Sequence, residues 1–329
     1  MDKIKIGWAG CGYHSYNMLF DCLRNTPSQV VAACDADPLR LELFAGRYNI
    51  AAQYADYREM LDKERLDAVI CVINADLHYE VAKTCLNKGI SVFVEKTPCR
   101  TAAQAEELAA LQARSRAFAM TGFNRRHAVG YAMLKRIIET EEFGRKTMYL
   151  AKYNASGYKS EDFYIFNHIV HHLDLARYLL GEIALTFADR VRVSERQVGF
   201  HICFRTDSGL IGTIQSGSLQ YIEYPMERVE ITGVGTRAAV DNIKRLEYDR
   251  PTTKKRTAAE AELRDGMDTL SWSHNHGNLI ENDLNGFKDE IETFVDCVAN
   301  GKIPAETFAD SVHTMRLLED LNEMLRFRD

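Results

Sequence analysis

The segment NHIVHHLD, from Asn167 to Asp174, gathers side chains that can bind metals or move protons. Apolar periodicity over residues 166–180 predicts a helix here. At about 100° per residue, Asn167, His171 and Asp174 fall on one face of that helix. An imidazole can exchange protons near neutral pH, whereas an amide can orient a hydroxyl but cannot take a proton. This face is typical of a proton-transfer site, or of a helix with an ordinary interior histidine.

A second face of the same helix carries His168 and His172. Their spacing could hold a metal ion, but metal sites generally need a third ligand and supporting groups around it. The other closely spaced pair, His274 and His276, is far away in the sequence. We therefore expect no metal, and keep His172 as a candidate substrate contact.

A glycine-rich turn, GCGYHS, begins at Gly10 after an apolar run and before a helical pattern. It has the G-x-G-x-x-G spacing, with the small residue Ser15 in the third position. Gly10 permits a tight turn, and Gly12 lets the backbone approach a pyrophosphate at a helix N-terminus. The turn predicts a dinucleotide site rather than an ordinary strand turn. The predicted cofactor contacts in it are Gly10, Cys11, Gly12, Tyr13 and His14.

Asp35 ends the next apolar run, VVAACD, where a carboxylate can accept both hydroxyls of an adenosine ribose. Its charge would repel a 2′-phosphate, so the sequence favours NAD over NADP. Arg40 is near enough in the sequence to accommodate such a phosphate, although a solvated helix position explains it more simply.

Glu95 and Lys96 follow the apolar strand SVFV at its carboxyl end, where open α/β sheets bind their ligands. A lone lysine at a strand end is usually solvated. After a dinucleotide loop, and with Pro98 to hold the turn, this pair instead predicts a cleft with a basic group in it.

The elements that must position these residues change in character at about residue 123. Before it, apolar runs such as VVAACD and DAVICVI alternate with amphipathic helical patterns such as DPLRLELFAGRY. Such alternation predicts a parallel sheet with helices on both faces. Asp37-Pro38 and Thr101 are typical helix starts, and Gly89 is typical of a helix end.

After residue 124, two helices at about 127–141 and 166–180 flank the strand KTMYLAKYNAS, and a series of strands follows. The turn TDSG between two of those strands predicts a hairpin, so this half is expected to be an antiparallel sheet with a few helices. Residues 283–328 are helical again, with a break at Ile303-Pro304. We predict an α/β protein with a Rossmann doubly wound domain over 1–123 and an α+β substrate and oligomerisation domain over 124–329, built on an open, mostly antiparallel sheet. The last helix is expected to pack back towards the first domain.

Composition limits the classes of partner. The chain has 329 residues, 46% of them hydrophobic, and a formal net charge of -6. We expect neither nucleic acid nor membrane as a partner. The eight cysteines are scattered, the N-terminus lacks a signal-peptide pattern, and no apolar run is long enough to span a bilayer. These features predict a cytoplasmic protein.

The motifs AGCGYH, VINADLHYEVAKTCLNKGISVFVEKTPC, GFNRRH and HHLDLARYLLGE, with Asp35 after the first, occur in an order that resembles the glucose–fructose oxidoreductase / inositol dehydrogenase / MocA family. The resemblance covers nearly the whole length and is most specific from Asn74 to Pro98. It implies a Rossmann domain, a C-terminal α/β domain and a cofactor in the cleft between them. Members are mostly NAD(P)-dependent dehydrogenases or reductases of sugars, polyols and sugar derivatives.

The resemblance also implies roles for individual residues. Lys96 would transfer the proton of a substrate hydroxyl, with a pKa lowered by burial and by the nicotinamide, and His171 would be its partner. Asn167 takes the place of the usual family aspartate, and Thr97 separates Lys96 from Pro98 where the family commonly has Glu-Lys-Pro. The further cofactor contacts implied or expected are Arg40, Ile73, Asn74, His78, Glu95 and Asn124. The expected substrate contacts are Arg125, Tyr158, Tyr164, Asn167, His171 and His172, with Phe163 and Trp272 as further pocket aromatics.

We therefore predict an NAD-dependent oxidoreductase that acts on a secondary alcohol of a sugar or polyol. Two alternatives stay open, since some family members cleave glycosides through transient oxidation and others are regulators without catalysis. Asn167 is compatible with both, whereas an intact Lys96 and His171 argue against a silent regulator. An open sheet face predicts a homodimer or homotetramer.

Overall fold

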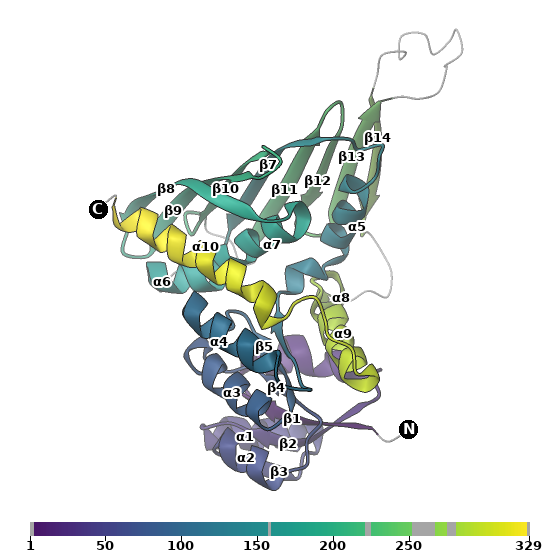
Figure 1. Ribbon diagram of the computed structural model, residues 1–329, viewed down its shortest axis with the longest axis vertical. Coiled ribbons are helices and arrows are strands. Elements are labelled where there is room, and N and C mark those ends of the chain that lie inside the picture. The colour runs from purple at the N-terminus through teal and green to yellow at the C-terminus, as the bar shows by residue number, and fades with distance from the viewer. Residues whose placement is uncertain (1–2, 157–158, 221–224, 252–266, 275–280, 328–329) are drawn as a thin grey trace. The chain divides into compact units, whose positions relative to one another are not determined.

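The computed structural model describes residues 3–156, 159–220, 225–251, 267–274 and 281–327 (Figure 1). The chain forms two compact units. Unit 1 comprises Met1–Asn124 and Gly286–Glu319, and unit 2 comprises Arg125–Asn285 and Asp320–Asp329.

Unit 1 is built on a six-stranded sheet in the order β3-β2-β1-β4-β5-β6, and each pair of neighbours is parallel. The strand order reverses between β1 and β4, which is the switch point where open α/β sheets hold their ligands. The strands are β1 (Ile4–Ala9), β2 (Ser28–Cys34), β3 (Ala52–Tyr54), β4 (Ala68–Cys71), β5 (Ser91–Glu95) and β6 (Ala119–Gly122).

Helices cover both faces of this sheet. One buried cluster includes Trp8, Phe44, Phe93 and Phe294, and another includes Val81, Leu108 and Phe308. Phe294 is on a helix near the C-terminus, so residues 286–319 complete the core of unit 1. The helices are α1 (Pro38–Tyr48), α2 (Tyr57–Lys63), α3 (Ala75–Asn87), α4 (Ala102–Gln112), α9 (Phe287–Asn300) and α10 (Phe308–Arg326), with the last turns of α10 in unit 2.

The helix ends agree with the signals in the sequence. Asp37 accepts hydrogen bonds from the backbone of α1, and Thr101 accepts one from Gln104 at the start of α4. Gly89 follows α3 with φ of 71°. These residues fix where each helix begins or ends.

Unit 2 is built on an eight-stranded sheet in the order β14-β13-β12-β11-β7-β10-β9-β8. Only the neighbours β7 and β10 are parallel among the described pairs. The strands are β7 (Lys146–Asn154), β8 (Ile183–Ser194), β9 (Gln197–Thr206), β10 (Ile211–Gly217), β11 (Met226–Gly233), β12 (Arg237–Asp241), β13 (Arg245–Pro251) and β14 (Met267–Ser273).

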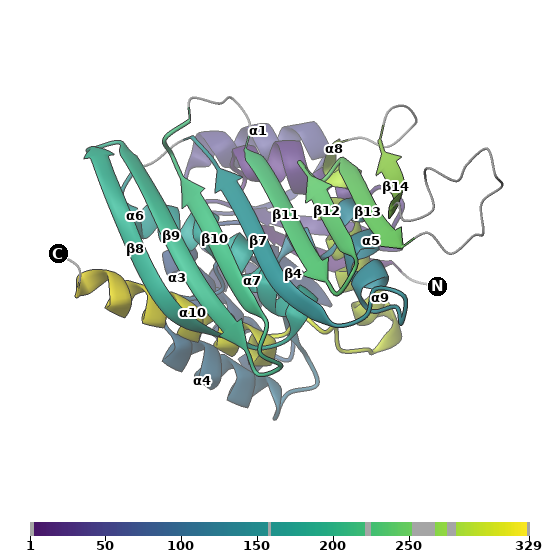
Figure 2. The same cartoon turned by 90° about the horizontal axis from the view of Figure 1, so that it is seen from above.

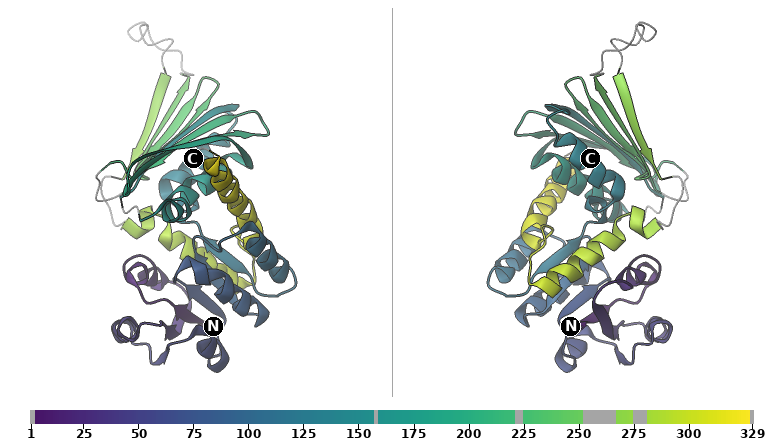
Figure 3. Two further views of the ribbon diagram at one scale, coloured as in Figure 1. Left: turned by 90° about the vertical axis from the view of Figure 1, so that its left-hand side faces the viewer. Right: turned by 90° about the vertical axis from the view of Figure 1, so that its right-hand side faces the viewer.

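Helices pack against one face of this sheet, and Figure 2 looks onto the other face, over which no helix of the described residues passes. Figure 3 shows the same one-sided arrangement from two further directions. Alternation of buried and exposed residues along β9 and β11 matches a sheet with one covered face. The helices are α5 (Val129–Ile138), α6 (Glu161–Tyr164), η4 (Ile165–Ile169), α7 (Val170–Leu180) and α8 (Glu281–Leu284).

The predicted fold class is confirmed, including the TDSG hairpin between β9 and β10. The sequence did not indicate the three-residue edge strand β3, the short helix α2 or the polar strand β14. The expected helix after the glycine turn is instead a π-helical turn, η1 (Ser15–Leu19), followed by a 3-10 turn, η2 (Phe20–Leu23).

Candidate active site

The glycine loop of unit 1 lies at the carboxyl end of β1. Gly10 has φ of 95°, and a Cβ there would collide with the carbonyl oxygen of Val72, so only glycine fits. The Gly10 carbonyl accepts hydrogen bonds from the Trp8 indole Nε1 at 2.9 Å and the Ser15 hydroxyl at 2.6 Å. Ser15 is therefore not only small but also stabilises the turn through its hydroxyl. Trp8 stabilises the same turn, and no sequence motif indicates this role.

Gly12 is a glycine for a different reason. A Cβ at this position would have no atom of the described protein within 4 Å. The protein itself therefore does not require glycine here, and the backbone of the loop is open on this side. Such an open cradle beside a helix start fits the pyrophosphate of a dinucleotide, which needs close approach to the backbone. The side chain of Tyr13 in the same loop is 76% exposed.

Asp35 follows β2 and is tied to the same loop. Its Oδ2 accepts a hydrogen bond from the backbone N–H of Cys11 at 2.7 Å, and its Oδ1 accepts one from Asp37 at 2.8 Å. The carboxylate is therefore fixed beside the loop, where it fits a ribose. Arg40 is a mostly exposed residue of α1 that pairs with Asp37 at 3.3 Å, in agreement with a solvated helix position.

Glu95 and Lys96 form the turn after β5. Glu95 is buried, its Oε1 lies 3.1 Å from Nε2 of His14, and its Oε2 accepts a hydrogen bond from the Lys96 backbone at 3.2 Å. Burial raises the pKa of the Glu95 carboxyl, but the attraction of His14 and Lys96 outweighs this and holds the pKa below its ordinary value of 4.5. Glu95 is thus a buried carboxylate. The peptide bond between Lys96 and Thr97 is cis.

His78 supports this turn from helix α3. Its Nδ1 lies 2.8 Å from the carbonyl oxygen of Thr97. Because a carbonyl oxygen can only accept a hydrogen bond, Nδ1 carries the ring proton and donates the hydrogen bond. Burial lowers the pKa of His78, so the ring is a neutral brace. Asn74 caps α3 through a hydrogen bond from Asp76 at 3.2 Å.

The remaining cofactor candidates of unit 1 differ in exposure. Ile73 is half-buried and its side chain lies beside Gly10, whereas Asn124 is buried at the end of the unit. Neither was expected to do chemistry.

In unit 2, the histidine-rich helix is interrupted by the π-helical turn η4 between α6 and α7. Asn167 lies in this turn and donates a hydrogen bond from Nδ2 to the carbonyl oxygen of Phe163 at 2.9 Å. The acceptor identifies the amide nitrogen, so Oδ1 is the atom that Asn167 has left for other partners. One turn further, the His171 side chain is buried on α7.

Arg125, an expected substrate contact, and its neighbour Arg126 are each paired with a buried acid. Arg126 forms a bidentate pair with Asp174, with atom distances of 2.8 Å and 2.6 Å, and both side chains are buried. Arg125 pairs with the buried Glu227 of β11 at 3.3 Å. Both arginines are therefore fixed inside unit 2, and no motif in the sequence indicates Glu227 as a partner.

His172 and Tyr164, both expected substrate contacts, are fully buried. Nε2 of His172 is 3.4 Å from Oε2 of Glu227, and the His172 side chain is fully buried. Tyr164 is also fully buried and stacks on Phe200. The structure makes both of them core residues, because packing against the sheet leaves their rings no exposed edge.

The other aromatic candidates are not brought into one cluster. Phe163 is half-buried on α6, and Trp272 is half-buried on β14. Tyr158 and His276 lie outside the described residues. Among the described residues, no group of three or more histidine, cysteine or acidic side chains could hold a metal ion. Nor does any helix of the described part combine the length and apolarity needed to cross a bilayer.

The glycine loop lies at the switch point of a parallel sheet, is open to a pyrophosphate on one side and has an acid fixed beside it. This arrangement is typical of dinucleotide-dependent enzymes. Comparison with known proteins gives the family. Residues 4–123 match the oxidoreductase family with an NAD-binding Rossmann fold, and residues 142–323 match the C-terminal alpha/beta domain of the same family. The chain belongs to this family of NAD(P)-binding oxidoreductases, and the resemblance in its motifs is confirmed.

Individual proteins similar to this chain are named as dehydrogenases. A D-apiose dehydrogenase of Paraburkholderia graminis is 27% identical over 96% of this chain and 86% of that protein. An inositol 2-dehydrogenase of Salmonella typhimurium is 34% identical over 49% of this chain and 50% of that protein. A crystal structure of a dehydrogenase from Chromobacterium violaceum shares the fold with a TM-score of 0.89 at 20% identity, covering 100% of this chain and 96% of that one.

Proposed function

We propose that this protein is an NAD-dependent dehydrogenase of a secondary alcohol in a sugar or polyol. The observation that carries the proposal is the Glu95–Lys96 turn at the carboxyl end of β5, a buried carboxylate and a lysine in the unit that holds the dinucleotide loop. The names of the apiose and inositol dehydrogenase relatives support the substrate class.

In this proposal, Lys96 removes the proton of the substrate hydroxyl while a hydride leaves the carbon that bears this hydroxyl. NAD supplies the hydride acceptor when it is bound. His171 hydrogen-bonds the reacting oxygen, and reduction of the ketone is the same chemistry in reverse. Asn167 accepts a hydrogen bond from a substrate hydroxyl through Oδ1, because its Nδ2 is engaged by Phe163.

We propose NAD rather than NADP because of Asp35. Its carboxylate is fixed by two backbone amides beside the loop, where a 2′-phosphate would meet its charge. Arg40 is engaged with Asp37 on the exposed side of α1 and does not offset that charge. Comparing the Kd of NAD and NADP in wild type and in Asp35→Ala tests this, since the variant is expected to lose the discrimination.

The test of the activity is a screen of sugars and inositols for NAD reduction, followed by Lys96→Met. We expect the variant to bind NAD with unchanged affinity and to lose hydride transfer. Turnover retained in Lys96→Met would contradict the assignment. Product formed with no net change in nicotinamide absorbance would instead indicate the redox glycosidase of the alternative prediction.

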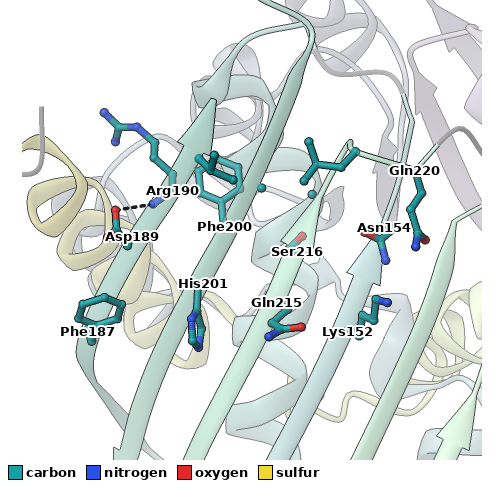
Figure 4. A pocket seen from close by; sticks show the side chains of 14 residues that line it. Lys152, Asn154, Phe187, Asp189, Arg190, Phe200, His201, Gln215, Ser216 and Gln220 are labelled. Atoms are coloured by element: carbon teal, nitrogen blue, oxygen red, sulfur yellow. Dashed lines mark hydrogen bonds between the residues drawn. The ribbon is translucent and has the colours of Figure 1, made fainter. Parts of the chain in front are cut away.

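We also propose that the open face of the unit 2 sheet pairs with a second copy of this chain. Met148, Leu150 and Ile211 are 41 to 51% exposed on this face. A separate hollow of about 550 Å³ lies further along the strands of the same sheet, and Figure 4 shows Lys152, Gln215 and His201 of its lining on the neighbouring strands β7, β10 and β9. Apolar side chains in such number favour burial between copies. Light scattering is expected to give a dimer or tetramer, and Leu150→Lys a smaller species; a monomeric wild type would contradict this.

A cytoplasmic location is part of the proposal. All eight cysteines are free thiols and seven are buried, as expected in a reducing compartment. Fractionation of cells that express the tagged chain would test the location.

A further inference from the structure

Two segments of unit 1 that are far apart in the sequence are joined by one imidazole. His14 belongs to the dinucleotide loop, directly before η1, and its Nε2 lies 3.1 Å from Oε1 of Glu95. Glu95 uses its other oxygen to accept the backbone N–H of Lys96. A continuous chain of polar contacts therefore runs from the loop through Glu95 to Lys96.

The two partners of this link differ in exposure. The Glu95 side chain is 8% exposed and that of His14 is 39% exposed. The imidazole also packs edge-on against Phe287 at the start of α9, with 5.4 Å between ring centroids. The ring is thus held on two sides, unlike a surface histidine that samples many rotamers.

Burial of Glu95 decides what the link does. An exposed pair contributes little, because water solvates each partner when the other is removed. A buried carboxylate that loses its partner must be compensated by other groups nearby. After His14, the group whose attraction acts most on Glu95 is Lys96, ahead of His78, so a change at His14 is felt by the lysine.

We propose that His14 is a positioning residue that couples the dinucleotide loop to Lys96 through Glu95. Loop geometry that suits the cofactor then fixes the Glu95 carboxylate, and that carboxylate fixes the backbone of the lysine. His78 holds the other side of the same turn through the Thr97 carbonyl, so Lys96 lies between two histidine-anchored neighbours. The inference rests on the proposed role of Lys96 for its importance, but the coupling is measurable without turnover.

The variants are His14→Ala, which removes the donor, and His14→Gln, whose amide can still donate to Glu95. Lys88→Ala is the matched control. It removes a side chain as exposed as His14, 36% against 39%, whose partner Asp62 at 2.6 Å is itself 65% exposed, elsewhere in unit 1. The first readout is the Kd of NAD, measured by calorimetry on the full chain.

We expect His14→Ala to weaken NAD binding roughly tenfold, the typical effect of losing a hydrogen bond to a charged group. His14→Gln should restore most of this loss, and Lys88→Ala should bind as wild type does. In an E95Q background, the further change H14A should have little effect, because the link is already weakened. A full H14A effect in that background would mean that His14 acts on the cofactor directly, and would overturn the proposal.

The second readout is the rate at which acetic anhydride acylates Lys96 in the cofactor-free protein, followed by mass spectrometry. Only the neutral amine reacts, and an uncompensated Glu95 favours the protonated lysine. We expect slower acylation of Lys96 in His14→Ala and not in Lys88→Ala. Equal rates in all variants would overturn the coupling. Failure of Lys96→Met to abolish turnover would overturn the proposed function and leave this coupling standing.

Discussion

Asn167 donates its side-chain amide to the carbonyl oxygen of Phe163 within a single turn of the helix. The π-helical turn η4 changes the local hydrogen-bond pattern, and the amide supplies a donor to a carbonyl at this point. An aspartate in the same place would set a carboxylate against that carbonyl. The amide at position 167, where the resemblance implies an aspartate, thus has a structural role in its own helix.

Asn167→Asp is expected to cost stability, because one hydrogen bond is lost and two acceptors are brought together. Losing a donor of this kind costs about 1 kcal/mol. Urea unfolding measures the change, and Asn167→Ser, which loses the amide without adding charge, serves as the control. The carboxylate should also shift the pH profile of turnover; an unchanged profile would remove residue 167 from the proton network.

Much of the fold could be predicted because local signals and long-range packing agree. Asp37 and Thr101 are helix caps both by type and in the structure. The apolar runs DAVICVI and SVFV correspond to the strands β4 and β5, and every residue of these two strands is buried, as in a parallel sheet covered on both faces. The sequence did not predict β3, which is only three residues long, or β14, which is largely polar.

The candidate site was predictable only where a backbone requirement selects the residue type. Gly10 belongs to this class, because its positive φ and the nearby Val72 carbonyl leave room for glycine alone. The sequence did not predict the roles of Glu227 and Trp8, because a single buried glutamate or tryptophan has no spacing pattern. The role of Glu227 arises from a contact with Arg125 that is distant in sequence, and that of Trp8 from its indole hydrogen bond to Gly10. Tyr164 and His172, which are expected substrate contacts, are both fully buried, and residue type alone does not distinguish a pocket wall from a core.

The pair of Arg126 and Asp174 gives a second prediction. Both groups are buried and hydrogen-bonded to each other. Arg126→Ala removes the bidentate partner and leaves the buried carboxylate with Arg177 at 4.0 Å, so it should cost up to about 3 kcal/mol in the free energy of unfolding. Arg316→Ala, which breaks an exposed pair with Glu106, is the control and should cost no more than about 1 kcal/mol. Similar losses in the two variants would contradict the argument from burial.

Glu227 predicts a dependence of stability on pH. Burial raises the pKa of its carboxyl, but Arg125 and His172 outweigh this and hold the pKa below the ordinary 4.5. The unfolded chain therefore takes up this proton first as the pH falls. The stabilisation is complete above the unfolded value and is lost as the pH falls through the lower folded value.

The difference in free energy of unfolding between wild type and Glu227→Gln should thus be largest at neutral pH and should narrow in acid. Urea titrations from neutral pH down to about pH 3 measure it. A difference that does not change with pH would mean that the carboxylate is not held below its ordinary pKa.

Gly10 and Gly12 give a matched pair of tests, because the same substitution is expected to lower stability at one position and only NAD affinity at the other. Gly10→Ala forces a side chain into positive φ and into the Val72 carbonyl, so it should lower the free energy of unfolding by several kcal/mol. Gly12→Ala meets no protein atom within 4 Å and should unfold as wild type does. Its methyl group instead enters the space assigned to the pyrophosphate, so NAD affinity should fall with stability unchanged. Urea unfolding combined with NAD calorimetry separates the two effects. Normal NAD binding by Gly12→Ala would show that the open side of the loop is not where the cofactor approaches.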